Sequence, residues 1–146
     1  MKKYSLLKTL IIICFCGLYQ LSIGQSNNAN NPPIPKLYQI TFLKSTDDDP
    51  TDLVAYIQAN WFAMDAQAKQ QGLITSYELF VSDDKNKTWN VMVRVGYPTA
   101  AGYSAIRADF EKIRKAHQLV LVKGKGLKSL GKFIDSRNIR PVISKK

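Results

Sequence analysis

Cysteine and histidine are scarce in this sequence of 146 residues, which contains two cysteines and one histidine. Both cysteines, Cys14 and Cys16, lie in an N-terminal segment that we expect to be cleaved off. The remaining chain has no cysteine, so it cannot form disulfides, carry out thiol catalysis or bind a metal through cysteine. Since His117 is the single histidine, a metal site would have to be built from carboxylates almost alone. We expect no metal site and no cofactor.

The chain also lacks an apolar run of the roughly 20 residues that a membrane span needs. Its longest apolar run, residues 10–18, follows three lysines, which is typical of a secretory signal. Ser22 and Gly24 stand at positions −3 and −1 of a cleavage site before Gln25. Neither cysteine follows a small residue, as a lipid anchor would require. We predict an exported protein, periplasmic or extracellular, with no stable membrane insertion after cleavage.

These observations predict three segments. Residues 1–24 form the signal peptide. Residues 25–35 are polar, contain several asparagines and prolines and have no periodicity, which indicates a flexible leader. Residues 36–146 are expected to form a single domain, because this length suffices for one core that buries over ~60% of the unfolded surface.

Acidic residues are few in the last part of the chain. The formal net charge is +10, and residues 107–146 contain twelve basic and three acidic residues. This surplus is typical of a solvated helix face and tail, and the alternative is a surface that binds anionic lipid head groups or glycans. Aromatic residues that could stack on bases are not interleaved with these cations, so we expect no nucleic-acid partner.

Hydrophobic periodicity predicts a strand followed by a long helix. Residues 37–44 alternate, which indicates a strand. Asp49 is placed to cap a helix in which Pro50 occupies the first position. Apolar residues then recur at helical spacing until Gly72 supplies the stop. These recurring residues are Leu53, Ile57, Trp61, Met64 and Ala68.

Residues 73–82 and 88–97 both alternate and are separated by a polar turn, which predicts an antiparallel hairpin. One face is expected to be a core face. It collects Leu73, Tyr77, Leu79, Val81, Trp89, Val91, Val93, Val95 and Tyr97. The other face is half polar. It collects Ile74, Ser76, Glu78, Phe80, Asn90, Met92 and Arg94.

A second helix is expected after Pro98, with Thr99 as its cap and its end near His117. Residues 118–134 contain three glycines and predict a broken helical excursion, although a short strand is also compatible with them. The β-branched residues 139–144 predict a last strand, at an edge or a bulge because of Pro141. The resulting fold class is α+β, a ferredoxin-like split βαβ plan with a four-stranded antiparallel sheet and two main helices on one face.

In this arrangement the chain resembles the dimeric α/β-barrel superfamily, in the form found in small exported proteins. The resemblance rests on Trp61 and Met64, Gly72-Leu73-Ile74, Trp89-Asn90-Val91, Tyr97-Pro98, Tyr103 and Phe110. It covers residues 36–144 and implies a homodimer whose sheets face each other. It also implies a ligand site between the helices and the sheet or inside the barrel. The superfamily includes cofactor-independent monooxygenases, haem enzymes and proteins without known activity.

Residues 126–132 match the phosphate-loop pattern G-x-x-x-x-G-K, but the next position must be Ser or Thr to hold magnesium, and here it is Phe133. The better candidate site is the pair Glu78 and Arg94, which share a face on adjacent strands. Ser76, Asn90, Gln39 and Thr41 are expected nearby, and an ordinary cross-strand ion pair is the structural alternative. Trp61, Met64 and Tyr103 could line a pocket between helices and sheet or simply form core. His117 is a further candidate ligand contact, or a packed residue at a helix end.

Two classes of function follow. The first is an exported homodimer that binds a small-molecule ligand through Glu78, Arg94, Asn90, Trp61, Tyr103 and His117. The second is a cofactor-independent, monooxygenase-type enzyme in which Arg94, Asn90 and His117 would hold a substrate anion. A basic module that binds anionic surfaces is a further alternative. The sequence shows no strong acid–base pair, which favours binding, and it identifies neither the ligand nor any catalytic residue.

Overall fold

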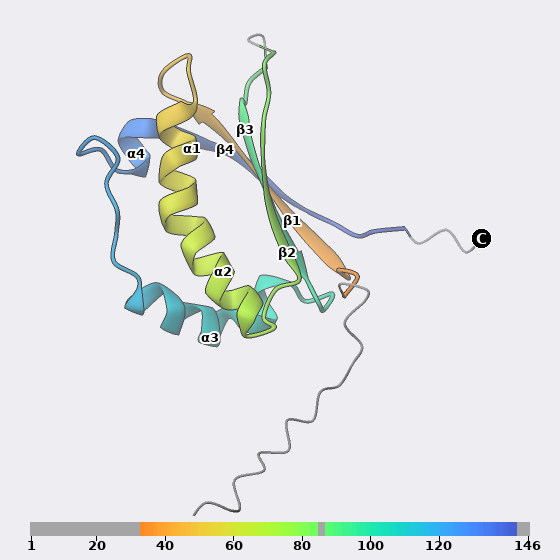
Figure 1. Ribbon diagram of the computed structural model, residues 1–146. Coiled ribbons are helices and arrows are strands. Elements are labelled where there is room, and N and C mark those ends of the chain that lie inside the picture. The colour runs from red at the N-terminus through yellow and green to blue at the C-terminus, as the bar shows by residue number, and fades with distance from the viewer. Residues whose placement is uncertain (1–32, 85–86, 143–146) are drawn as a thin grey trace, which may run out of the picture. The chain divides into compact units, whose positions relative to one another are not determined.

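The computed structural model describes residues 33–84 and 87–142, so the predicted signal peptide and most of the leader lie outside the described residues. The strands and helices follow in the predicted order (Figure 1). They are β1 (Leu37–Ser45), α1 (Thr51–Ile57), the π-helical turn η1 (Gln58–Phe62), α2 (Ala63–Gln70), β2 (Ser76–Val81), β3 (Val91–Tyr97), α3 (Tyr103–Ala116), α4 (Leu127–Leu130) and β4 (Gly131–Ile139).

The four strands form one sheet in the order β2-β3-β1-β4, and all neighbouring strands are antiparallel. The helices lie on one side of this sheet (Figure 1). The predicted ferredoxin-like α+β fold is therefore confirmed. The two central strands carry the core, because Leu37 and Leu43 of β1 and Val91, Val93 and Tyr97 of β3 are buried.

The first helical segment begins one residue later than predicted, because Pro50 rather than Asp49 occupies the N-cap position of α1. The Asp49 carboxylate accepts hydrogen bonds from the backbone N and the Oγ1 of Thr51, at 2.9 and 2.6 Å. These bonds satisfy an N–H group that the helix itself leaves unpaired. Gly72 ends the segment with φ of +71°, a conformation that favours glycine. The π turn η1 between α1 and α2 was not predicted, since periodicity at 3.6 residues does not reveal one extra residue in a turn.

The predicted hairpin is confirmed, with Glu78 directly opposite Arg94. Three face assignments are wrong, each at a residue outside the paired strands. Ile74 is only 3% exposed and belongs to the core on the helix side. Strict alternation predicts the other face of the sheet for this residue. Trp89 was assigned to the core face, but its ring contacts Phe42, with centroids 5.0 Å apart. Asn90 is the third case and is described with the site.

The connection from β3 to β4 differs in detail from the prediction. Thr99 does not cap α3 with its side chain, and Gly102, with φ of +58°, precedes the helix instead. Residues 117–121 are extended, Val122 and Lys125 form a small bridge, and α4 is a single turn. The predicted broken helical excursion is therefore mostly not helical.

The last strand is also misplaced in the prediction, which put it at residues 139–144. β4 ends at Ile139, and Pro141 follows the strand, where its missing N–H costs no ladder bond. β4 is an edge strand that pairs with β1 alone, and most of its side chains are exposed.

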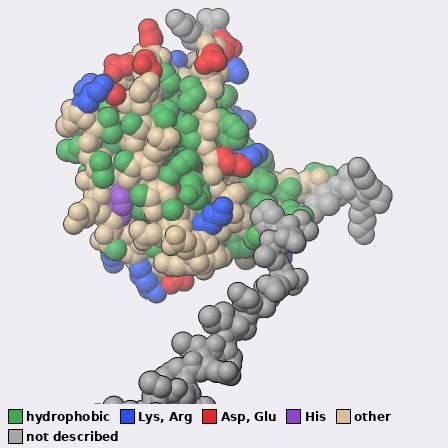
Figure 2. Space-filling view, viewed as in Figure 1, with side chains coloured by type: hydrophobic (Ala, Val, Ile, Leu, Met, Phe, Trp, Pro, Cys, Tyr) green, Lys and Arg blue, Asp and Glu red, His purple; other side chains and the backbone are tan. Residues whose placement is uncertain are grey.

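Buried apolar residues form two clusters between the helices and the sheet. Figure 2 shows apolar side chains gathered there, with acidic side chains grouped at the end that holds the β1–α1 loop and the tip of the hairpin. Within residues 33–84 and 87–142, no helix is both long and apolar enough to cross a membrane.

Candidate ligand-binding pocket

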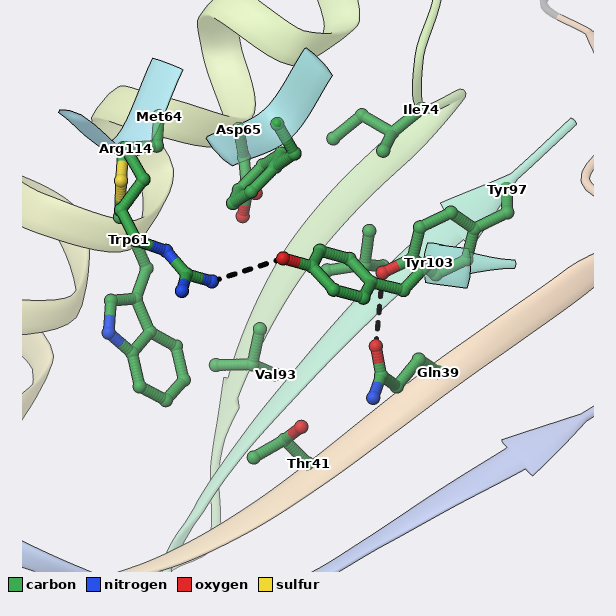
Figure 3. Close-up of a pocket in the computed structure, with 12 residues that line it drawn as sticks. Gln39, Thr41, Trp61, Met64, Asp65, Ile74, Val93, Tyr97, Tyr103 and Arg114 are labelled. Atoms are coloured by element: carbon green, nitrogen blue, oxygen red, sulfur yellow. Dashed lines mark hydrogen bonds between the residues drawn. The ribbon is translucent and has the colours of Figure 1, made fainter. Parts of the chain in front are cut away.

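A pocket of about 420 Å³ lies between the helices and the sheet (Figure 3). Side chains from β1, β3, α2, α3, the π turn and the entry to β2 line it. They are Gln39, Thr41, Trp61, Met64, Asp65, Ile74, Val93, Val95, Tyr97, Tyr103, Phe110 and Arg114. The pocket therefore draws on every layer of the fold, and its shape depends on how the helices sit on the sheet.

Aromatic and aliphatic side chains form most of the wall. Trp61 comes from η1, and Met64 follows in the first turn of α2. On α3, Tyr103 and Phe110 pack edge to face, with ring centroids 5.7 Å apart. Val93 on the sheet supplies an aliphatic floor (Figure 3). Such a wall favours an apolar ligand, since transfer of apolar surface out of water is favourable.

Asp65 is the one acidic side chain in this wall, and it is only 6% exposed. Within the described part of the chain, no group donates a hydrogen bond to its carboxyl and no cation pairs with it. Burial raises its pKa from 3.8 to about 7, because removal from water penalises the charged form. A buried polar group without a partner is uncommon in proteins and is a candidate for binding something absent from the chain itself.

Tyr97 and Gln39 form a polar pair on the sheet side of the pocket. The Tyr97 hydroxyl donates to Gln39 Oε1 at 3.0 Å (Figure 3). The Gln39 amide in turn donates to Ser136 Oγ on β4 at 3.4 Å. Burial raises the pKa of Tyr97, and the negative charge of Asp65 raises it further. The Tyr97 side chain is therefore neutral at physiological pH, and its hydroxyl donates its hydrogen atom to Gln39.

Arg114 lies at the edge of the pocket with its side chain 54% exposed, and its charge is already matched. Its Nη1 lies 3.0 Å from Glu111 Oε1, and its Nη2 donates to the Tyr103 hydroxyl at 3.2 Å. The same hydroxyl donates to Glu111 at 3.0 Å. This closed triad holds the Tyr103 ring against the pocket.

Two of the predicted ligand contacts, Trp61 and Tyr103, line the pocket. Glu78 and Arg94 do not, since they lie on the sheet face that no helix of the described chain covers. They form the expected ion pair, with side chains 39% and 34% exposed, and the hydrogen bond from Arg94 to Glu78 raises the pKa of Arg94. Their role in binding stays a prediction.

Asn90 and His117 are engaged elsewhere. Asn90 is buried, and its Oδ1 accepts a hydrogen bond from the backbone N of Ser45 at 2.8 Å. The expectation that Asn90 lies beside Glu78 and Arg94 is wrong. Asn90 precedes the first residue of β3, and its side chain is hydrogen-bonded to the last residue of β1. His117 Nε2 lies 3.1 Å from Asn60 Oδ1, which only accepts, so His117 donates there. Neither residue lines the pocket.

Gln39 and Thr41 were expected beside the ion pair, and this was also wrong, because they face the helices and line the pocket. Asp65 and Arg114 were missed altogether. The signal for Asp65 was present in the sequence: it stands four residues after Trp61 and three before Ala68, on the apolar stripe of the helix. A carboxylate on such a stripe is expected to be buried.

Comparisons with known proteins find similar structures at low sequence identity. No protein-family model and no curated protein matches this sequence. The crystal structure of HapK from Hahella chejuensis is similar with a TM-score of 0.48 and 10% identity, over 75% of this chain and 96% of HapK. A dimeric protein of unknown function and ferredoxin-like fold from Bacteroides fragilis NCTC 9343 has a TM-score of 0.43 and 17% identity, over 71% and 94% of the two chains.

The pocket offers a volume for binding and one carboxyl for proton exchange. In the described part of the chain, no group of three or more His, Cys, Asp or Glu side chains is arranged to hold a metal ion. The wall offers apolar surface, one unpaired acid and three hydroxyls. The two tyrosine hydroxyls already donate their hydrogen atoms, and the Thr41 hydroxyl lies 3.4 Å from Ser136 Oγ.

Proposed function

We propose that this protein binds a small, largely apolar ligand in the pocket between its helices and its sheet. The observation that supports this is the preformed volume of about 420 Å³ with apolar walls and few polar groups. Ligand sites in proteins have volumes of roughly 300–1,000 Å³ and this kind of lining. The volume is at the lower end of that range and suits a compound with one to three rings.

A fluorescence titration tests the proposal, because one of the two tryptophans, Trp61, lies in the pocket wall. In a Trp89→Phe background, N-phenyl-1-naphthylamine, a neutral apolar probe, is expected to quench Trp61 emission on binding. Thr41→Phe adds a ring inside the pocket and is expected to weaken probe binding tenfold or more. Ile40→Phe is the matched control, since Ile40 is the next residue of β1 and faces the other side of the sheet.

The same titration distinguishes the pocket from the predicted site at Glu78 and Arg94. Binding in the pocket is expected to be unchanged in Arg94→Ala, which removes a charge from the opposite sheet face. Loss of binding in Arg94→Ala together with full binding in Thr41→Phe would place the ligand on the sheet face and overturn the proposal.

Two other functions have less support. An enzyme built on Arg94, Asn90 and His117 would need these residues around one substrate, yet none of them lines the pocket, and Asn90 and His117 have partners of their own. For a basic module, binding to anionic vesicles should fall steeply above ~0.15 M salt and weaken when Lys123, Lys125 and Lys128 are replaced together. Lys123 is already paired with Asp52 at 2.9 Å.

We further propose that the protein acts outside the cytoplasm as a homodimer. Export rests on the predicted signal peptide, and mass spectrometry of the native product should find Gln25 as the first residue. An intact Met1, or a lipid on Cys14 or Cys16, would contradict this. The dimer rests on the sheet face opposite the helices, which carries Tyr38, Ile40, Phe42, Phe80, Met92 and Ile139.

A further inference from the structure

Two charged side chains line the pocket, and Arg114 is paired with an acidic residue whereas Asp65 has no cationic partner among the described residues. The Arg114 guanidinium is held by Glu111 and Tyr103, so it has little left to offer a ligand anion. Asp65 lines the same pocket and is only 6% exposed as a residue, and its carboxyl has no hydrogen-bond partner within the described residues. The pocket therefore lacks a hydrogen-bond donor for the Asp65 carboxyl, and a ligand can supply one.

The walls around this carboxyl also suit a cation. Trp61, Tyr103 and Phe110 present aromatic rings to the pocket, and the faces of such rings attract cationic groups. An anionic ligand would meet the Asp65 charge without gaining a free cation in exchange. A neutral ligand with a hydroxyl could donate a hydrogen bond to the carboxylate but would leave its negative charge unmatched.

We propose that the ligand of this pocket is a small aromatic compound with a protonated amine, and that the amine donates to the Asp65 carboxylate. This inference rests on the proposed function, because it names the ligand class for the same pocket. The aromatic part would lie against the apolar wall. The ammonium group would point toward α2, where Figure 3 places Asp65.

Other ionisable groups around Asp65 do not replace the amine. On β3, Tyr97 donates its hydroxyl hydrogen to Gln39. On α3, Tyr103, Glu111 and Arg114 are bonded to one another. On α2 itself, Lys69 is exposed and its Nζ lies 5.9 Å from the centre of the Tyr77 ring.

Three matched probes test the inference: 2-phenylethylamine, 2-phenylethanol and 3-phenylpropionate, which differ only in their terminal group. Dissociation constants are measured by calorimetry or ligand-observed NMR with the full mature chain at pH 8 and pH 6. At pH 8 the amine should bind about tenfold or more tightly than the alcohol, since charge-assisted hydrogen bonds are the stronger ones. The propionate should bind most weakly.

Acidification should reduce this preference. With a pKa of about 7, the ionised fraction of Asp65 falls about tenfold from pH 8 to pH 6, while an aliphatic amine stays protonated. Affinity for the amine should therefore fall by up to that factor, and affinity for the alcohol should not. Asp65→Asn should bring the amine to the level of the alcohol at both pH values. Asp109→Asn, which removes an exposed carboxylate paired with Lys112, is the control.

The outcomes separate the two proposals. If the alcohol binds and Thr41→Phe blocks it, but the native protein does not prefer the amine, the ligand class is wrong and the pocket function stands. An amine preference that survives in Asp65→Asn, or that is independent of pH in the native protein, equally overturns the role of Asp65. If none of the three probes binds at millimolar concentration, both proposals fail.

Discussion

At the scale of single residues, the ionised form of Asp65 that would bind an amine is also the form that makes the folded state less stable. A carboxyl whose pKa is raised on folding favours the folded state only while it is protonated. The native protein therefore holds this proton between the unfolded pKa of 3.8 and the folded value of about 7. Over that window the free energy of unfolding decreases as pH rises, and above about pH 7 the full penalty is present.

Asp65→Asn keeps the shape of the side chain and removes its charge. The variant should be more stable than the native protein at pH 8, by up to about 4 kcal/mol for a shift of this size, and close to it at pH 4. Urea unfolding at several pH values measures the difference. The exposed variant Asp109→Asn should show no such trend, and a constant difference between Asp65→Asn and native protein would contradict the prediction.

The three hairpin residues that were assigned to the wrong face share a cause. Ile74, Trp89 and Asn90 were assigned to faces by continuing strict alternation beyond the paired parts of β2 and β3. Alternation holds only where the backbone is pleated and paired, so one turn residue is enough to reverse the face. Within the ladder the same rule was correct, and it placed Glu78 and Arg94 side by side.

At the scale of elements, the side chain of Asn60 joins the first helical segment to the chain that follows α3. Its Nδ2 donates to the carbonyls of Tyr56 and Val120, both at 2.9 Å. Its Oδ1 accepts from the backbone N of Val120 at 2.8 Å and from His117. Asn60 lies in η1, one residue before Trp61 in the pocket wall, so these bonds also fix the π turn. The extended segment 117–121 has few buried side chains and depends on them.

Replacement of Asn60 by alanine should therefore release that segment. We expect a loss of about 2–3 kcal/mol in the free energy of unfolding, because buried backbone groups lose their partners. Hydrogen exchange at the Val120 amide should rise far more than exchange in the centre of β3. Gln58→Ala, an exposed position in the same turn, should change neither quantity. Unchanged protection at Val120 in Asn60→Ala would show that the segment is held by other contacts.

Elements with one buried and one solvated face could be predicted from the sequence, and the others could not. The stripe from Leu53 to Ala68 and the alternation in β1 to β3 arise because each element packs on the core. β4 has no such pattern, since its backbone pairs with β1 while most of its side chains meet solvent. The pocket was foreseen only through Trp61, Met64 and Tyr103. Its wall is built from several strands and helices, so it is set by tertiary packing rather than by spacing along one element.

At the scale of the whole molecule, the sheet has two unlike faces. One is covered by helices and contains the pocket. The other face is rich in aromatic side chains and carries the ion pairs Arg94–Glu78 and Arg137–Asp135. The Arg94 guanidinium lies 5.0 Å from the centre of the Tyr38 ring and 5.4 Å from that of Phe80. A contiguous apolar surface of this kind usually marks an interface, and the internal ion pairs leave it without excess charge to repel a second copy.

The last prediction compares two phenylalanines of the sheet. Phe80 is 40% exposed and shares the uncovered face with Met92, its partner across the ladder. Phe133 is 60% exposed but pairs with Leu43, whose side chain faces the helices. If two copies associate through the uncovered face, Phe80→Glu buries a charge at the interface and should weaken the dimer by more than tenfold. Phe133→Glu adds the same charge at a more exposed position and should leave the dimer unchanged.

Sedimentation velocity from one to one hundred micromolar measures this comparison, and thermal unfolding shows that both variants remain folded. A native protein that sediments as a monomer throughout this range would contradict association through the sheet. Dissociation by Phe133→Glu rather than Phe80→Glu would move the interface to the edge strand β4, where an unpaired backbone ladder offers a different mode of pairing. Because the pocket lies on the helix side of the sheet, ligand binding should survive in Phe80→Glu even when the dimer does not.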